Sequence, residues 1–223
     1  DNLDRLAKLT EKGSINIMLD KMERQQELEY ENEARFNHLH AIGKHIEDTL
    51  REKIGSDLIQ VDNPMRTEGN TIVEDVQNGQ DIVVRIKNGE EWVDIFYVEV
   101  KSKWDFSEPA HMSTRQVRMA ALHPNEYALC CVDLRKHKHE DLENLPTEII
   151  LECTNVKMGI GEILNPMLKA ILEADNRSDD EQIKISEYRS NMGASIFEKG
   201  DSLDVLLNTI ETKIRQKLSS MSS

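Results

Sequence analysis

The run Tyr97-Val98-Glu99-Val100-Lys101 places an acid and a base within the apolar alternation of a β-strand. Successive side chains of a strand point to opposite faces, so Glu99 and Lys101 share one face while Val98 and Val100 share the other. Burying a carboxylate and an ammonium costs free energy unless the two are paired or coordinate a metal. The run therefore predicts a strand that ends in a functional polar site.

A preceding apolar strand carries another acid, Asp81, and the polar turn Asn88-Gly89-Glu90 joins the two strands. If only the first two turn residues form the loop, Asp81 lies opposite Phe96 and faces away from Glu99. A three-residue loop or one bulge sets Asp81 opposite Tyr97, diagonal to Glu99 and on its face. A site shared by both acids thus requires the longer loop or a bulge, and bulges are common beside active sites.

A polar pattern follows the hairpin. Ser113 is placed to cap a helix, because its hydroxyl can accept a hydrogen bond from a free amide of the first turn. Gln116 and Ala120 are four residues apart and share a helical face. Two interpretations of Gln116 remain open: it orients a phosphate or an attacking water, or it is an ordinary amide at the edge of the core.

In this order, Asp81, Glu99-x-Lys101 and Ser113-x-x-Gln116-x-x-x-Ala120 resemble the PD-(D/E)xK nuclease superfamily. Within it, they are most similar to the endonuclease-like domain named after the plant protein NO VEIN, often attached to larger ATPases and to restriction or anti-phage proteins. The resemblance spans residues 43–134, and Gln80 stands where the superfamily's name has proline. It implies an α/β (α+β) mixed sheet, a restriction-endonuclease-like core with flanking helices, and an N-terminal helical extension.

The resemblance also implies a metal-dependent endonuclease that hydrolyses phosphodiester bonds of DNA, or of RNA. Mg²⁺ or Mn²⁺ would be held by hard oxygen ligands, and Lys101 would position or deprotonate the attacking water. The implied metal ligands are Asp81, Glu99, the carbonyl of Val100 and Glu47. The implied catalytic residues are Asp81, Glu99, Lys101 and Gln116, and the implied nucleic-acid contacts are Lys103, Ser113, Arg115 and Arg118. Glu47 follows the apolar Ile46 in a helix, so an ordinary solvated glutamate is the alternative.

Charge argues against indiscriminate coating of nucleic acid, because the formal net charge is −14 and phosphate binding depends on lysine and arginine. The distribution is uneven. Seven lysines and arginines against six acids lie between Glu99 and Glu140. The acidic excess therefore lies outside the candidate site.

Three cysteines, an odd number, lie in apolar surroundings at Cys130, Cys131 and Cys153. They predict buried free thiols in a reducing compartment, hence a cytoplasmic location. No apolar run approaches the ~20 residues that span a bilayer, and no secretory leader is visible. The chain opens on Asp1 without methionine, so we expect a fragment of a longer protein.

Apolar periodicity predicts the following elements. Helices are expected over 3–34, 36–54, 113–120, 161–173 and 203–218, and strands over 57–61, 80–86, 97–101, 126–132, 147–153, 183–188 and 194–197, with polar loops over 63–78 and 105–112. The chain divides into a helical extension or linker over 1–35, a nuclease-like core over 36–140, and C-terminal elements over 141–223 that complete the same domain.

Three classes of function remain. The first is the endonuclease, as the effector module of a larger prokaryotic defence or restriction protein with an ATPase partner. The second is a non-cutting nucleic-acid-binding or scaffold module of the same fold. The third is an interaction domain that forms homo-oligomers through its N-terminal helix, with the Glu99-x-Lys101 pattern a coincidence.

Overall fold

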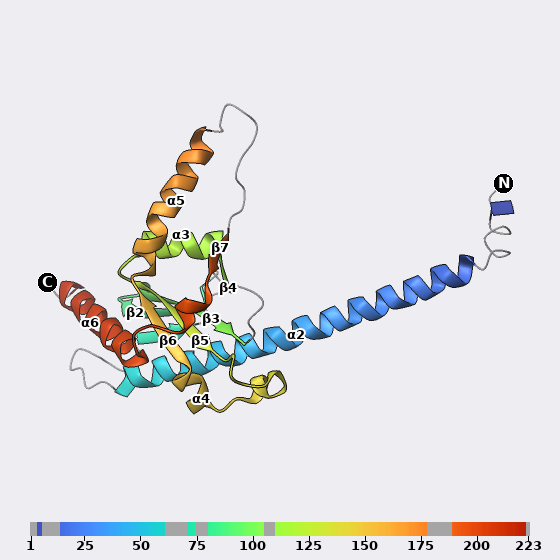
Figure 1. The fold of residues 1–223 in the computed structure, drawn as a ribbon. Helices are drawn as coiled ribbons and strands as arrows, with labels where there is room; N and C mark the ends of the chain where they lie inside the picture. The colour runs from blue at the N-terminus through green and yellow to red at the C-terminus, as the bar shows by residue number, and fades with distance from the viewer. Residues whose placement is uncertain are drawn as a thin grey trace. The chain divides into compact units, whose positions relative to one another are not determined.

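The computed structural model describes residues 4–5, 14–60, 71–74, 80–104, 110–177 and 189–221. The chain forms two compact units, Asp1–Ile42 and Gly43–Ser223. Helix α2 (Ser14–Gln60) contributes to both units. All candidate site residues lie in the second unit, which is a mixed α/β structure (Figure 1).

After α2, the described elements run in the following order (Figure 1). They are β1 (Thr71–Glu74), β2 (Ile82–Asn88), β3 (Glu91–Lys103), β4 (Ala110–Ser113), α3 (Thr114–Leu122), β5 (Tyr127–Asp133), η1 (His139–Asn144), α4 (Thr147–Glu152), β6 (Thr154–Met158), α5 (Ile160–Arg177), β7 (Arg189–Met192), η3 (Ala194–Phe197) and α6 (Leu203–Met221).

The main sheet has the order β1-β2-β3-β5-β6, and β4 pairs with β7 in a separate two-stranded sheet. Only β3 and β5 are parallel, and the other neighbours are antiparallel. The central position of β3 explains its apolar run, because the strand is covered on both faces from Ile95 to Val100. A buried central strand holds its side chains in fixed positions, which suits a site that must be preorganised.

One face of the sheet packs against α3 and α5. Its core cluster joins Tyr97 and Leu129 of the sheet to Val117 of α3 and Leu164 of α5. Alternation along β3 places Glu99 and Lys101 on the face of Tyr97, toward α3. Helix α5 comes close to α3 because Gly161 has no side chain: a Cβ there would lie 1.9 Å from the carbonyl oxygen of Ala120.

Helices α2 and α6 are amphipathic, because their buried residues recur at helical spacing. In α2, buried residues recur at four-residue spacing from Ile46 onward, namely Ile46, Leu50, Ile54 and Leu58. In α6, the buried residues also recur at four-residue spacing, Leu206, Ile210 and Ile214, and the helix contacts β3 and β6. Each helix thus buries a stripe of apolar residues at helical spacing.

Several predicted elements are confirmed and others are wrong. The strands around Asp81 and Glu99, the strand near residue 127, and the helices at 161–173 and 203–218 are present. The predicted strands 57–61, 147–153 and 194–197 are wrong: residues 57–60 continue α2, 147–152 form α4, and 194–197 form η3. The predicted strand 183–188 lies outside the described residues. The predicted loops 63–78 and 105–112 are wrong at 71–74, which form β1, and at 110–112, which belong to β4.

These errors share a physical cause. Short apolar runs do not distinguish a strand from one or two helical turns, because both can bury the same residues. The real strand after α4 is β6, which begins one residue after Cys153. In α2, the apolar stripe continues through Leu58 with helical spacing, so the helix persists where we predicted a strand.

All three cysteines are free thiols. Cys130 and Cys131 are buried in β5, and Cys153 is only partly buried. Burial raises the pKa of Cys131 to about 12, so this thiol stays protonated. Among the described residues, no helix is both long enough and apolar enough to cross a membrane.

Candidate active site

The hairpin between β2 and β3 brings Asp81 to the face of Glu99 through a bulge. Near the turn, Asn88 pairs with Glu91, and this register would set Asp81 opposite Val98. The register shifts between Val84 and Arg85, after which Ile82 pairs with Val98 and the next position faces Glu99. The bulge that we predicted as a requirement is present, although Asp81 comes opposite Glu99 rather than Tyr97.

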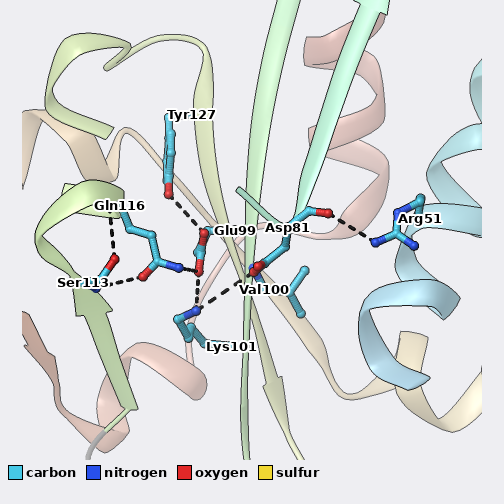
Figure 2. A network of polar contacts seen from close by, with 8 residues as sticks. All are labelled: Arg51, Asp81, Glu99, Val100, Lys101, Ser113, Gln116 and Tyr127. Atoms are coloured by element: carbon cyan, nitrogen blue, oxygen red, sulfur yellow. Dashed lines mark hydrogen bonds and ion pairs between the residues drawn. The ribbon is translucent and has the colours of Figure 1, made fainter. Parts of the chain in front are cut away.

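Glu99 is the centre of a buried polar cluster (Figure 2). Its side chain is 0% exposed, and three donors from three different elements contact it. Its Oε1 accepts hydrogen bonds from Nζ of Lys101 and from Nε2 of Gln116. Its Oε2 accepts a hydrogen bond of 3.4 Å from the hydroxyl of Tyr127. These contacts fix the orientation of a carboxylate that would otherwise be costly to bury.

Gln116 is itself held in one orientation by the start of α3. Ser113 is the N-cap, and its backbone N–H donates to Oε1 of Gln116 at 2.8 Å. The backbone N–H of Gln116 donates in return to the Ser113 hydroxyl at 3.4 Å. This capping box commits the amide oxygen to the helix cap and leaves the amide nitrogen to face Glu99. Gln116 is therefore part of the cluster, while its role in orienting a phosphate or an attacking water stays a prediction.

Asp81 lies beside the same cluster and is tied to β3 and α2 (Figure 2). Its Oδ2 accepts a hydrogen bond of 2.7 Å from the backbone N–H of Val100 and lies 4.0 Å from Nζ of Lys101. Its backbone carbonyl accepts a hydrogen bond of 3.3 Å from Arg51, which also pairs with Asp48. The ammonium of Lys101 thus lies between two carboxylates, and α2 contacts the site directly.

Burial and neighbouring charges shift the pKa values of three groups in the cluster. Burial raises the pKa of Glu99 to about 8, and the positive charge of Lys101 offsets only part of that shift. Burial, followed by the negative charge of Asp81, raises the pKa of Glu47 to about 7. Burial alone would lower the pKa of Lys101, but Glu99 and Asp81 outweigh it and raise the value. Three acids therefore act on the ammonium of Lys101, while Lys44 and Arg51 also stabilise the charged form of Glu47.

The donor set fits a hard divalent cation by its chemistry. Carboxylate oxygens are what Mg²⁺ and Mn²⁺ prefer in proteins, and Asp81 and Glu99 present them side by side. In the arrangement described here, however, Lys101 occupies the space between the two carboxylates. In the part of the chain that the structure describes, no three His, Cys, Asp or Glu side chains are grouped so as to hold a metal ion.

The predicted nucleic-acid contacts differ in exposure. Arg115 and Arg118 are exposed on α3, next to Gln116. Lys103 is only 6% exposed, so it is poorly placed to contact a phosphate at the surface. Ser113 is exposed, but its hydroxyl and backbone serve the helix cap. Val100 contributes its N–H to Asp81, while the ligand role of its carbonyl stays a prediction.

Two residues of the site were missed from the sequence. Tyr127 opens β5, where the parallel register pairs it with Tyr97 and aims it at the face of Glu99. Arg51 is four residues after Glu47 on α2, so helical spacing alone could have marked it as a neighbour. No sequence signal identified Tyr127, because the register between β3 and β5 depends on a crossover of more than twenty residues.

Comparison of the chain with protein-family models, with curated proteins and with solved structures found no significant match.

Proposed function

We propose that the second unit is a metal-dependent endonuclease domain that hydrolyses phosphodiester bonds of DNA. The observation that carries this proposal is the convergence of Asp81, Lys101 and Gln116 on the buried carboxylate of Glu99. These residues come from the end of one strand, the middle of its neighbour and the first turn of a helix. Buried charges are rare unless function requires them.

The residues of the cluster would have separate roles in metal binding and in catalysis. Asp81 and Glu99, with the carbonyl of Val100 and with Glu47 further out, would hold Mg²⁺ or Mn²⁺. When bound, the ion would polarise the phosphate and lower the pKa of a coordinated water. Glu99 is held by Gln116 and Tyr127, so its carboxylate needs little reorganisation.

Lys101 has a raised pKa, which favours a charged ammonium. It would therefore stabilise negative charge that develops on the phosphate, or orient the water, rather than act as the base. Arg115 and Arg118 are exposed on the helix that also carries Gln116, which suits contacts to the nucleic-acid backbone. RNA is an alternative substrate with the same phosphodiester chemistry.

The resemblance stated above supports a wider setting, in which this domain is the effector module of a larger prokaryotic defence or restriction protein with an ATPase partner. The exposed Met22, Leu28, Tyr30 and Phe36 on α2 support assembly of copies through the N-terminal helix. Light scattering of the full chain and of a Leu28→Glu, Phe36→Glu variant tests this assembly. A monomer in both cases would reject it.

A non-cutting module of the same fold is the second candidate. It is favoured by the ammonium of Lys101 between the carboxylates and by the lack, in the described residues, of three grouped metal-ligating side chains. The two candidates differ in their response to metal. The non-cutting module would bind nucleic acid equally well with and without a divalent ion.

Plasmid nicking tests the proposal. The purified chain and its Glu99→Ala and Lys101→Ala variants are incubated with supercoiled plasmid, linear duplex and single-stranded DNA, in Mg²⁺, Mn²⁺ or EDTA. Metal-dependent nicking that both variants lose supports the endonuclease. Glu91→Ala is the matched control, because Glu91 is an exposed glutamate on the same strand. No cutting by the unmodified chain, with no metal binding by calorimetry, would favour the non-cutting module.

A further inference from the structure

A second feature of the unit is a groove that shares β4 with the surroundings of the polar cluster, through Met112 in the groove and Ser113 at the helix cap. The groove has a volume of about 500 Å³ and lies between α5 on one side and β7 and η3 on the other. We call it the methionine groove, because four of the chain's nine methionines line it, Met112, Met158, Met167 and Met192. Its existence does not depend on the proposed nuclease activity.

The floor of the groove belongs to the core, but its wall does not. Met112, Ile160 and Leu164 are at most 5% exposed, whereas Ile163 and Met167 are 62% and 56% exposed. Residues 160, 163, 164 and 167 share one side of α5 by helical spacing. The core therefore covers only part of the apolar side of α5. The helix also continues beyond α3, away from the sheet (Figure 1).

The composition of the groove indicates a polypeptide ligand. Methionine side chains are flexible and polarisable, and they are enriched at surfaces that adapt to protein partners. Two lysines, Lys157 and Lys199, also line the groove, and none of the described residues that line it is an aspartate or glutamate. In a chain of net charge −14, these two lysines favour carboxylates on a ligand that binds there.

We propose that the methionine groove binds an acidic amphipathic helix of another polypeptide. The apolar side chains of that helix would follow an i, i+3 or i+4, i+7 pattern and cover Ile163 and Met167. Its carboxylates would lie against Lys157 and Lys199. Met112 is adjacent in sequence to Ser113, the N-cap of α3, so the docked helix would contact the strand that leads into the polar cluster.

Methyl NMR of the full chain, labelled at the methionine methyl groups, tests the proposal directly. The probe is a synthetic amphipathic peptide with leucine anchors and glutamates on both flanks. We expect the four groove methyls to shift on titration, while those of Met22 and Met221 do not. A matched peptide with alanine in place of the leucines should bind at least about tenfold more weakly.

Substitutions distinguish specific binding at the groove from nonspecific binding to exposed apolar residues. Met167→Glu should weaken binding at least about tenfold, whereas Leu122→Glu, at an exposed leucine outside the groove, should not change it. Lys157→Glu with Lys199→Glu should reverse the preference, so that a lysine-flanked peptide binds better than the glutamate-flanked one.

Three results would overturn the proposal. The first is the absence of groove shifts with peptide at about 1 mM, the weak end of specific affinities. The second is binding that does not respond to charge reversal. The third is a dimer, seen by light scattering, that Met167→Glu converts to monomer, because the groove would then be covered by a second copy of this chain.

Discussion

The polar cluster and the methionine groove depart from ordinary protein packing in opposite directions. At the cluster, a carboxylate is fully buried and an ammonium mostly buried, where an apolar core would be more stable. At the groove, Ile163 and Met167 are exposed to water, although burying these apolar side chains would make the protein more stable.

The two departures have different consequences for folding. In the cluster, Lys101, Gln116 and Tyr127 all donate hydrogen bonds to Glu99, so a change in one alters the others. The open side chains of the groove make few contacts, so a change there should leave the fold intact. The effect of a cluster substitution on stability should therefore depend on how it changes the charge balance around Glu99, whereas substitutions at the rim of the groove should leave stability unchanged.

The largest effect is expected for Glu99→Gln. If the cluster is catalytic, metal-dependent nicking should fall at least about 10³-fold, because a carboxylate ligand is lost. The free energy of unfolding at pH 8 should stay the same or rise, since a neutral amide replaces a buried charge of similar size. Nicking assays and urea denaturation measure the two quantities. Equal loss of activity and stability would mean that Glu99 serves the fold alone.

Lys101→Met should have the next largest effect, which is a loss of stability. It leaves Glu99 buried without its positive partner, which costs about 3–5 kcal/mol for a buried pair. Combining it with Glu99→Gln should recover most of that loss, because the uncompensated charge is gone. Urea denaturation at pH 9 measures both variants, and Lys87→Met, at an exposed lysine of β2, is the control. Additive effects of the two substitutions would show that the pair is not coupled.

Much of this site could be predicted from the sequence, because its chemistry is local. The alternation along β3 placed Glu99 and Lys101 together, and the spacing of Ser113 and Gln116 identified a helix cap. The register that brings Asp81 to Glu99 could be stated only as a requirement. It depends on a bulge at Ile95, which no residue type in the hairpin specifies.

The fold was less predictable where the decisive contacts are distant in sequence. The residues from Thr147 to Cys153 have strand-like composition, yet they form a short helix before β6. The position of Tyr127 depends on the parallel pairing of β3 with β5. Tertiary packing selects among local conformations of similar energy. Local patterns in a single sequence do not predict which of them is selected.

The pH dependence of stability sharpens the comparison further. In metal-free buffer, Glu99 has its pKa raised from 4.5 to about 8. The folded protein then holds a proton that the unfolded chain has released, so stability is fully present below about pH 4.5 and declines as the pH rises toward 8. Each unit of pKa difference corresponds to about 1.4 kcal/mol, so the decline should reach a few kcal/mol.

Thermal unfolding from pH 4 to 9 in EDTA measures this decline. Glu99→Gln should flatten the profile between about pH 5 and 8. The smaller contribution of Glu47 to the pH dependence of stability should remain, because its pKa is raised to about 7. A profile that is the same in the unmodified chain and in Glu99→Gln would show that Glu99 does not hold its proton in this range. Glu91→Gln, at the exposed end of β3, should not alter the profile.

The smallest effects are expected at the rim of the methionine groove. Ile163→Thr and Met167→Gln should each change the free energy of unfolding by no more than about 0.5 kcal/mol, because both side chains are mostly exposed. Met112→Ala, at the floor of the same groove and 0% exposed, should cost about 2–5 kcal/mol. Urea denaturation separates the two classes. If the rim substitutions were as costly as the floor substitution, Ile163 and Met167 would be part of the core in solution, and no open groove would remain for a partner to fill.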